Sequence, residues 1–468
     1  MPFKPVILWT DALIFVLVIA VLLFILRARA KEHLRAPWRR VARNRMAMVT
    51  LVILLAYVLV GLLDSLHFRP ALPDTPSGQR EYAVEVLSVL DVLVTPLRTQ
   101  EEKTYSAPFA THLYAKETVE RADGTQERIF PRLRYGGAHL TDLSARGEDI
   151  ALTALRGFIE GVVAWAAFAA LLAAWLARRG RVVYREMLQK IMRGATDIPW
   201  RAVLITSGVL IVLTAMAAEL GVKYHLLGTD KVGQDVLYQA IKSIRTGLVI
   251  GTLTTLVMLP FAVLLGIMAG YFRGVVDDAV QYLYTTLSSI PGVLLIAAAI
   301  LMLQVYIANH PEQFETVALR ADVRLLFLCI ILGITSWTGL CRLLRGETLK
   351  LREMDYIQAA QAFGVGHFKI ITRHILPNVM HIVLITVVLD FSGLVLAEAV
   401  LSYVGVGVDP TTLSWGNMIN AARLEMAREP MVWWPLLAAF VFMFALVLPA
   451  NLFSDAVRDA FDPRLRKL

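Results

Sequence analysis

The chain has 468 residues, of which 57% are hydrophobic and 18% charged, and its net charge is +8. A water-soluble domain cannot bury that much apolar surface, so the composition excludes a large soluble enzyme. The basic residues lie beside long apolar segments, without the stacking or basic-groove pattern of nucleic-acid-binding proteins. We therefore expect no nucleic acid partner, and we expect the charge to set orientation in a membrane.

Nine segments are long and apolar enough to cross a bilayer as helices, for which roughly 18 to 20 residues suffice. In chain order they are 6–26, 46–63, 158–177, 202–218, 248–270, 283–305, 325–344, 379–400 and 433–452. The predicted fold class is an all-α membrane protein, a polytopic bundle of about nine transmembrane helices.

Positive charge follows the first and third apolar segments, in residues 27–45 and 178–193. Because cytoplasmic loops are enriched in Lys and Arg, both runs are expected inside. The same rule places the N-terminus and the stretch 64–153 outside, and the C-terminus and the basic loop 345–373 in the cytoplasm.

The first apolar segment has an alternative interpretation. Ala28-Arg29-Ala30 has the form of a signal-peptidase site, and cleavage there would start the mature chain at Lys31. However, the apolar run is long for a signal peptide, and positive charge follows it instead of preceding it. A retained membrane helix is therefore the expectation.

The outside stretch 64–153 mixes short β-like runs, at 82–86 and 92–95, with turn signals such as Asp123-Gly124. It is long enough for a small extracytoplasmic lobe, and it carries no metal or nucleophile pattern. A docking or packing role is expected for it.

The inside loop between the seventh and eighth segments predicts a short helix followed by a turn. Tyr356–Phe363 is rich in helix-forming residues and includes the small Ala359 and Ala360. Gly364 is expected to end this helix, since glycine tolerates the left-handed conformation, and Pro377 marks the start of the next helix. A short helix held at the membrane face, with small side chains that a partner can approach closely, would act as a rigid lever.

This loop resembles the coupling loop of ABC importer permeases, in which Glu-Ala-Ala is followed by a glycine and by Ile-Leu-Pro at the next span. The resemblance implies that the short helix docks in a groove of an ATPase subunit. The matching residues here are Tyr356, Gln358, Ala359, Ala360, Gly364, Gly366, Ile375, Leu376 and Pro377. Gln358 stands where the family usually has Glu, so one charge is missing from the docking surface.

Other motifs extend the resemblance. Before the fifth segment the chain carries Leu227-Gly228-Thr229-Asp230, followed by Gly233 and Asp235, and after the eighth it carries Glu398 to Leu401 and Ser414 to Met418. Together they resemble the C-type permease subunit of dipeptide and oligopeptide ABC importers (DppC/OppC-like), over about Leu226 to Arg464. The resemblance implies a six-helix type I importer core plus three extra helices.

The chain is accordingly divided into five parts. These are an extra N-terminal helix with a basic linker (1–45), a helix similar to the family's first (46–63), the lobe (64–153), two additional helices (154–221) and the permease core (222–468), whose coupling loop spans 345–378. The added N-terminal parts are expected to be a membrane adaptor, a lid over the pathway or a binding site for a partner specific to this protein. The sequence favours none of these three roles over the others.

Charged and turn residues near the eighth segment are candidates for the translocation path or gate. They are Asp390, Glu398, Ser402, Gly405 and Trp415. Ionisable groups within a membrane are costly and face a partner or water. Asp390 and Glu398 are expected either to make interhelical or water-facing contacts, or, for Asp390, to line the path and attract a peptide amino terminus.

The motif before the fifth segment supplies Gly228, Asp230, Gly233 and Asp235. Carboxylates favour helix N-termini, so Asp230 and Asp235 are expected to cap the helical lead-in to this segment. Direct contact with a peptide or a binding protein is the alternative.

No Walker A pattern is present, and the histidines lack metal-site spacing, so neither a nucleotide nor a metal is expected on this chain. The resemblance implies ATP and Mg in two partner ATPase subunits, a related B-type permease as heterodimer partner, a substrate-binding protein and a bacterial cytoplasmic membrane. Peptides are the expected substrate, with nickel chelates or peptide-like antibiotics as alternatives. A membrane-embedded enzyme would need a nucleophile–base pair, and an ATPase-independent transporter would lack the inside loop.

Overall fold

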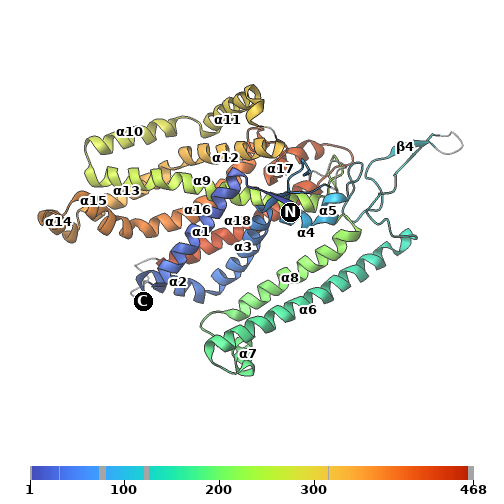
Figure 1. The fold of residues 1–468 in the computed structure, drawn as a ribbon, viewed down its shortest axis with the longest axis horizontal. Helices are drawn as coiled ribbons and strands as arrows, with labels where there is room; N and C mark the ends of the chain where they lie inside the picture. The colour runs from blue at the N-terminus through green and yellow to red at the C-terminus, as the bar shows by residue number, and fades with distance from the viewer. Residues whose placement is uncertain (1–2, 31, 73–80, 121–125, 315, 462–468) are drawn as a thin grey trace.

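The computed structural model describes residues 3–30, 32–72, 81–120, 126–314 and 316–461. Most of them are helical, and the core helices run along the long axis of the molecule (Figure 1). The helices of the N-terminal half are α1 (Trp9–Ala30), α2 (Glu32–Arg43), α3 (Arg45–Asp64), α4 (Val89–Leu93), α5 (Thr95–Thr99), α6 (Arg146–Gly180), α7 (Tyr184–Arg193) and α8 (Trp200–Lys223). Those of the C-terminal half are α9 (Val236–Phe272), α10 (Val275–Ser289), α11 (Gly292–Asn309), α12 (Val317–Ser336), α13 (Thr338–Arg352), α14 (Asp355–Ala362), α15 (His367–Ile370), α16 (Leu376–Tyr403), α17 (Trp415–Glu425) and α18 (Trp434–Phe461).

Within the described residues, eight helices are long and apolar enough to span a membrane: α1, α3, α6, α8, α9, α11, α16 and α18. The predicted segment 283–305 is divided between α10 and α11, because Ile290 is extended before Pro291. The predicted segment 325–344 is divided between α12 and α13 at Trp337, and three charged residues lie in the first turns of α12.

Helix α9 is the centre of the core. It packs against α12, α13 and α16, and also against α3, α10 and α18. Near its end, a Cβ at Gly266 would lie 2.8 Å from the carbonyl oxygen of Cys341, and one at Gly270 would lie 2.6 Å from that of Arg345. The two glycines therefore let α9 and α13 approach to backbone contact.

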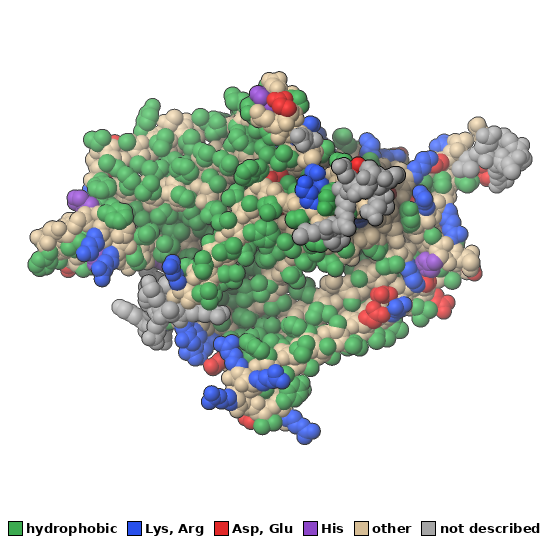
Figure 2. Space-filling model, in the orientation of Figure 1, with side chains coloured by type: hydrophobic (Ala, Val, Ile, Leu, Met, Phe, Trp, Pro, Cys, Tyr) green, Lys and Arg blue, Asp and Glu red, His purple; other side chains and the backbone are tan. Residues whose placement is uncertain are grey.

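The added N-terminal parts pack on this core in two places. Helix α1 lies against α12 and α9, whereas α6 and α8 form a tight hairpin that reaches the core through contacts of α8 with α3. In Figure 1 this hairpin slants away from the other helices. In Figure 2 apolar side chains cover the helices, and Lys and Arg gather around α7 at one end.

The lobe lies at the opposite end of the bundle from α7, α14 and the C-terminus (Figure 1). Strand β1 (Phe3–Val6) joins its antiparallel sheet with β2 (His67–Pro70) and β3 (Leu87–Ser88). A hairpin of β4 (Glu117–Glu120) and β5 (Gln126–Ile129) extends from it. The N-terminus and the lobe thus share one end.

Two strand predictions within the lobe are wrong. The run 82–86 makes only a single bridge at Tyr82, and the strand begins after it. The run 92–95 is helical, because the Ser88 side chain and Asp91 form a capping box that starts α4. The predicted turn Asp123-Gly124 and the predicted cleavage product's first residue, Lys31, lie outside the described residues.

Candidate coupling, anchoring and pathway sites

The coupling loop (345–378) contains the predicted short helix and glycine turn. Helix α14 is followed by Gly364 in the left-handed conformation, with φ +72°. Gly366 has extended backbone and starts α15. A π-helical turn ending at Ile375 follows, and Leu376–Pro377 begins α16. The chain therefore passes from the lever into a membrane helix without an intervening flexible loop.

One face of this loop is buried and the other is exposed. Ile357, Ile370 and Ile375 are all fully buried in the cluster built by α9 and α13. Phe363 is 86% exposed at the tip. Other exposed residues are Tyr356, Gln358 and Ala359, with Ala360 half-buried. Because no charged residue lies between Tyr356 and Phe363, the face available to a partner is neutral and partly apolar.

Two ion pairs connect the beginning of the coupling loop to the end of α9 and to the first turn of α10. The Arg345 guanidinium donates to both carboxylate oxygens of Asp277 at 2.5 and 2.7 Å. This contact lowers the pKa of Asp277 and raises that of Arg345. Arg273 pairs with Glu353 at 2.5 Å. A bidentate pair fixes orientation as well as distance, so α10 and the loop are held as one unit.

Hydrogen bonds to Tyr271, at the end of α9, hold both sides of the lever. The Tyr271 hydroxyl lies 2.8 Å from His367 Nδ1, and Arg352 Nη1 donates to the Tyr271 carbonyl at 2.9 Å. Gln358 Nε2 donates to the Glu353 carbonyl at 3.2 Å. The amide that replaces the family's usual carboxylate therefore contributes to the loop's own structure.

The glycines of the outside motif form a socket for the lobe. Gly228 and Gly233 have φ +69° and +81°. A Cβ at Gly228 would lie 2.3 Å from the carbonyl oxygen of Ser106, and one at Gly233 would lie 1.8 Å from that of Glu102. Only glycine fits at these positions, because both conformation and space exclude a side chain.

The two aspartates of this motif have different roles. Asp235 accepts hydrogen bonds from the backbone N–H groups of Leu237 and Tyr238, and so makes the predicted N-cap of α9. Asp230 instead closes the preceding turn: it accepts from the backbone N–H groups of Val232 and Gln234. Asp235 therefore caps α9 as predicted, whereas the prediction that Asp230 also caps it is wrong, because Asp230 stabilises the preceding turn.

A buried charged cluster, the lobe anchor (Glu102, His225 and Asp235), joins the lobe to this motif. His225 Nδ1 lies 2.8 Å from Asp235 Oδ2, and its Nε2 lies 3.5 Å from Glu102 Oε1. Glu102 also accepts from three consecutive backbone N–H groups of the lobe, residues 134–136. All three side chains are at least nine-tenths buried.

The pKa values of the lobe anchor are displaced in opposite directions. Burial alone would raise the pKa of Glu102, but contacts with His225 and the three N–H groups lower it to about 2. Burial would lower the pKa of His225, but Asp235 and Glu102 raise it to about 9. At neutral pH the anchor therefore contains an imidazolium between two carboxylates.

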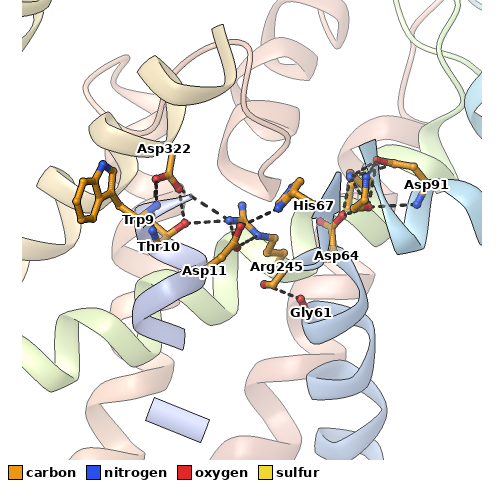
Figure 3. Close-up of polar contacts among 12 residues, drawn as sticks. Trp9, Thr10, Asp11, Gly61, Asp64, His67, Asp91, Arg245 and Asp322 are labelled. Carbon is orange, nitrogen blue, oxygen red and sulfur yellow. Dashed lines mark hydrogen bonds and ion pairs between the residues drawn. The ribbon is translucent and has the colours of Figure 1, made fainter. Parts of the chain in front are cut away.

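A second charged cluster joins the extra helix α1 to α9 (Figure 3). Arg245 Nη2 on α9 lies 2.5 Å from Asp11 on α1 and 3.9 Å from Asp322 on α12. The Thr10 hydroxyl donates to Asp322. His67, on β2, lies 2.7 Å from Asp11. One arginine therefore links the added helix, the lobe sheet and two core helices.

One turn earlier on α9, Lys242 makes a parallel set of contacts with Asp64 and Asp91, which are labelled in Figure 3. Its Nζ lies 2.5 Å from Asp64, at the end of α3, and 3.0 Å from Asp91 in the lobe. Sequence reasoning missed both clusters. The available signal was the pair of cations one helical turn apart at the start of α9, together with Asp11 in the first turn of an apolar segment.

Most of the path and gate candidates make contacts within the chain. Glu398 is 2% exposed and accepts from the Ser402 hydroxyl at 2.7 Å. Trp415 is 1% exposed, and its Nε1 donates to the Ala240 carbonyl at 3.1 Å. Gly405 has φ +84° and forms the turn after α16. Glu398, Ser402, Gly405 and Trp415 therefore build the turn at the end of α16 and its packing on α9, with their polar side chains hydrogen-bonded inside the protein.

Asp390 is different. It is half-buried on α16, and within the described part of the chain it has no hydrogen bond or ion pair. It does not meet Glu398, although both lie near one helix face. On the adjoining face of α16, about 100° around the helix from Asp390, Leu389, Leu396 and Val400 are exposed, at 42%, 42% and 56%. This strip of α16 is thus left uncovered by the chain's own helices.

A multi-spanning helical bundle with a rigid lever loop at one end defines a membrane transport subunit of the permease class. Residues 262–467 match the family described as "Binding-protein-dependent transport system inner membrane component". The chain belongs to this family of ABC importer permeases, whose members work with a second permease, ATPase subunits and a substrate-binding protein. It is accordingly a multi-pass inner-membrane transport subunit and not an enzyme.

Several curated relatives match about half of the chain. The oligopeptide transport system permease protein OppC of Mycobacterium tuberculosis is 32% identical over 244 residues, covering 52% of this chain and 77% of the relative. The glutathione transport system permease protein GsiD of Pectobacterium atrosepticum is 31% identical over 243 residues, 52% and 73% of the two chains. The dipeptide transport system permease protein DppC of Bacillus subtilis is 26% identical over 243 residues, 52% and 70%.

Proposed function

We propose that this chain forms half of the translocation pathway of an ATP-driven importer of dipeptides or oligopeptides. A B-type permease would supply the other half, two ATPase subunits would bind ATP and Mg, and a binding protein would deliver the peptide. The observation that carries the proposal is the coupling loop, whose exposed lever is rigidly tied to three core helices. The peptide assignment is supported by the names of the relatives.

The orientation follows from charge. The coupling loop, α7 and the basic residues that follow α6 all lie at one end of the bundle (Figure 1), and enrichment in Lys and Arg marks the cytoplasmic side. We therefore place the coupling loop and the C-terminus in the cytoplasm, where ATPases bind. The N-terminus and the lobe then face outward.

Force from the ATPases would reach the membrane helices by three routes. Buried Ile357 presses on the α9–α13 cluster. Bidentate Arg345 pulls α10 through Asp277. The third route is the continuous helix that runs from α15 through the π-helical turn into α16. Because all three routes are stiff, displacement of α14 becomes displacement of the helices.

The uncovered strip of α16 is where we place the pathway or the partner permease. Asp390 is the ionisable group on this strip, and a carboxylate within a membrane needs a partner or water. A peptide amino terminus would supply a positive partner. Uptake by an Asp390→Asn variant with normal membrane levels tests this role, and unchanged transport would remove Asp390 from the path.

The lever is tested in proteoliposomes containing the complete complex. Gly364→Pro forces φ away from +72° and should uncouple ATP hydrolysis from uptake, since proline fixes φ near −65°. Ala359→Glu puts a charge on the neutral docking face and should act in the same way. Ala427→Glu, at an exposed alanine on the outer side, is the matched control. If both lever variants transport like the control, the lever assignment is wrong.

The substrate class is tested in the same vesicles. Radiolabelled dipeptides and oligopeptides, a nickel chelate and a peptide-like antibiotic are offered with each candidate binding protein. Uptake of peptides supports the proposal. Uptake of the chelate or antibiotic alone would support the importer role but would contradict the assignment of peptides as the substrate.

A further inference from the structure

A small charged cavity lies between the outer ends of α11 and α12 and the turn that follows α16. Its volume is about 270 Å³, and its lining includes Gln304, Ile307, Pro311, Arg320, Arg324 and Asp409. It is separate from the coupling loop, the lobe anchor and the Arg245 cluster. None of these residues belongs to the sequence motifs that carry the family resemblance.

Arg324 is the central group of this cavity. Only 7% of the residue is exposed. With its amide oxygen turned inward, Gln304 accepts from both terminal nitrogens of Arg324 at 2.8 and 2.9 Å. The Nε atom is buried and has no hydrogen-bond acceptor among the described residues. Buried guanidinium groups normally use Nε in a two-point contact with a carboxylate, so one acceptor is missing.

Asp409 does not fill this role. Its Oδ2 lies 3.5 Å from Arg324 Nη1, which is long for a charge-assisted hydrogen bond. Its Oδ1 is already used by the backbone N–H and hydroxyl of Thr411, at 2.9 and 2.7 Å. The Asp409 carboxylate therefore stabilises the turn in which it lies, and the Arg324 guanidinium remains incompletely paired.

Arg320 adds a second cation at the entrance. It is exposed, and its Nε donates to the Phe314 carbonyl at 2.8 Å, which holds the side chain in place. With Arg324 and Asp409, the lining carries two positive charges and one negative charge. The cavity therefore has an excess positive charge that one carboxylate would neutralise.

We propose that this cavity receives one acidic side chain of the substrate-binding protein when that protein docks on the outer face. The inference rests on the proposed function for the existence and the side of docking. The cavity is smaller than the roughly 300–1,000 Å³ of pockets that enclose a whole small-molecule ligand, so it suits a single side chain. Its apolar wall, with Ile307 and Pro311, would pack against the methylene groups of a glutamate.

The experiment uses the complete complex in proteoliposomes with the binding protein that supports uptake by the wild type. Its concentration is varied, and the half-maximal concentration is measured at low and high salt. Arg324→Gln should raise that concentration about ten-fold and Arg320→Gln about three-fold, with unchanged maximal uptake. The salt dependence should weaken in both variants. Arg428→Gln, an exposed outer arginine away from the cavity, should behave as wild type.

Arg320→Gln is the variant that should still fold if Arg324→Gln does not. The Arg320 side chain is exposed, and its loss leaves the buried contacts of Arg324 intact. As a second measurement, Arg320→Cys carrying a photo-crosslinker should capture the binding protein, and Arg428→Cys should not. Unchanged half-maximal concentrations in both glutamine variants, or no capture at position 320, would overturn the proposal. So would an effect that follows the phosphatidylglycerol content of the vesicles instead of the binding protein, since it would assign the site to a lipid headgroup.

Failure of the proposed function is a distinct result. If the wild-type complex imports no peptide, binding of each candidate binding protein to the immobilised complex is measured directly, and the same variants are compared. A weakened interaction in the Arg324 and Arg320 variants would then support the cavity even though the substrate is different.

Discussion

Replacing Glu102 by Gln should release the lobe from the permease core. The Glu102 carboxylate accepts three backbone N–H groups and faces the buried His225. The amide keeps the size but removes the charge, and it directs an NH₂ group at donors. Breaking a buried charged pair and leaving N–H groups unsatisfied costs about 3–5 kcal/mol. That loss is comparable to the whole stability expected for a small lobe.

The pH dependence of the wild type follows from the same groups. The pKa of His225 is raised from 6.5 to about 9, so its stabilisation is complete below about pH 6.5 and is lost as pH rises through 9. The pKa of Glu102 is lowered from 4.5 to about 2, so its stabilisation is complete above pH 4.5 and is lost as pH falls through 2. Lobe attachment should therefore be strongest between about pH 4.5 and 6.5.

Limited proteolysis of the purified protein in detergent measures this attachment, since cleavage within the lobe reports local opening. Glu102→Gln should be cut far faster than wild type at pH 6. The rise of its cleavage rate between pH 7 and 9 should be smaller than in the wild type but not absent, because His225 keeps its contact with Asp235. Lys103→Gln, a neighbouring exposed residue with a surface ion pair, serves as the control. Equal cleavage of Glu102→Gln and wild type at pH 6 would refute the anchor.

Three further substitutions test other contacts. Gly233→Ala should destabilise the lobe by more than about 2 kcal/mol, because its Cβ meets the backbone 1.8 Å away at a positive φ, and the same proteolysis assay would detect this. Arg245→Met should loosen α1 by about 3–5 kcal/mol, since it leaves Asp11 buried without its cation; an unchanged thermal unfolding midpoint would contradict that. Arg345→Gln should preserve ATP hydrolysis but lower uptake per ATP, and a normal ratio would show that α10 is not driven through this pair.

The sequence predicted the local features of the coupling loop correctly. Gly364 ends α14 because a left-handed residue is needed there, and Pro377 lies at the start of α16, directly after the π-helical turn. Asp235 caps α9 for an equally local reason. Each of these roles depends on neighbours within about four residues, so it can be read from the chain.

The covered and uncovered faces of α16 could not be predicted from the sequence, because the residue types of a span do not say which side other helices cover. Glu398 and Asp390 have the same charge and lie on the same helix. Glu398 is buried beneath α17, whereas Asp390 has no hydrogen-bond or ion-pair partner among the residues that the structure describes. Burial of a helix face depends on which helices pack against it. Contacts between distant elements decide that, and the hydropathy pattern alone does not.

By itself, the sequence determined that this is a membrane protein with an importer-type lever, because apolar length, charge bias and short-range turn chemistry are properties of contiguous residues. Only the tertiary structure decided how the added N-terminal parts are attached. Asp11, Asp64 and Glu102 are separated from their cationic partners by more than a hundred residues in the chain. Such pairs form because burying a charge is costly unless an opposite charge is brought to it, and the fold is what brings them together.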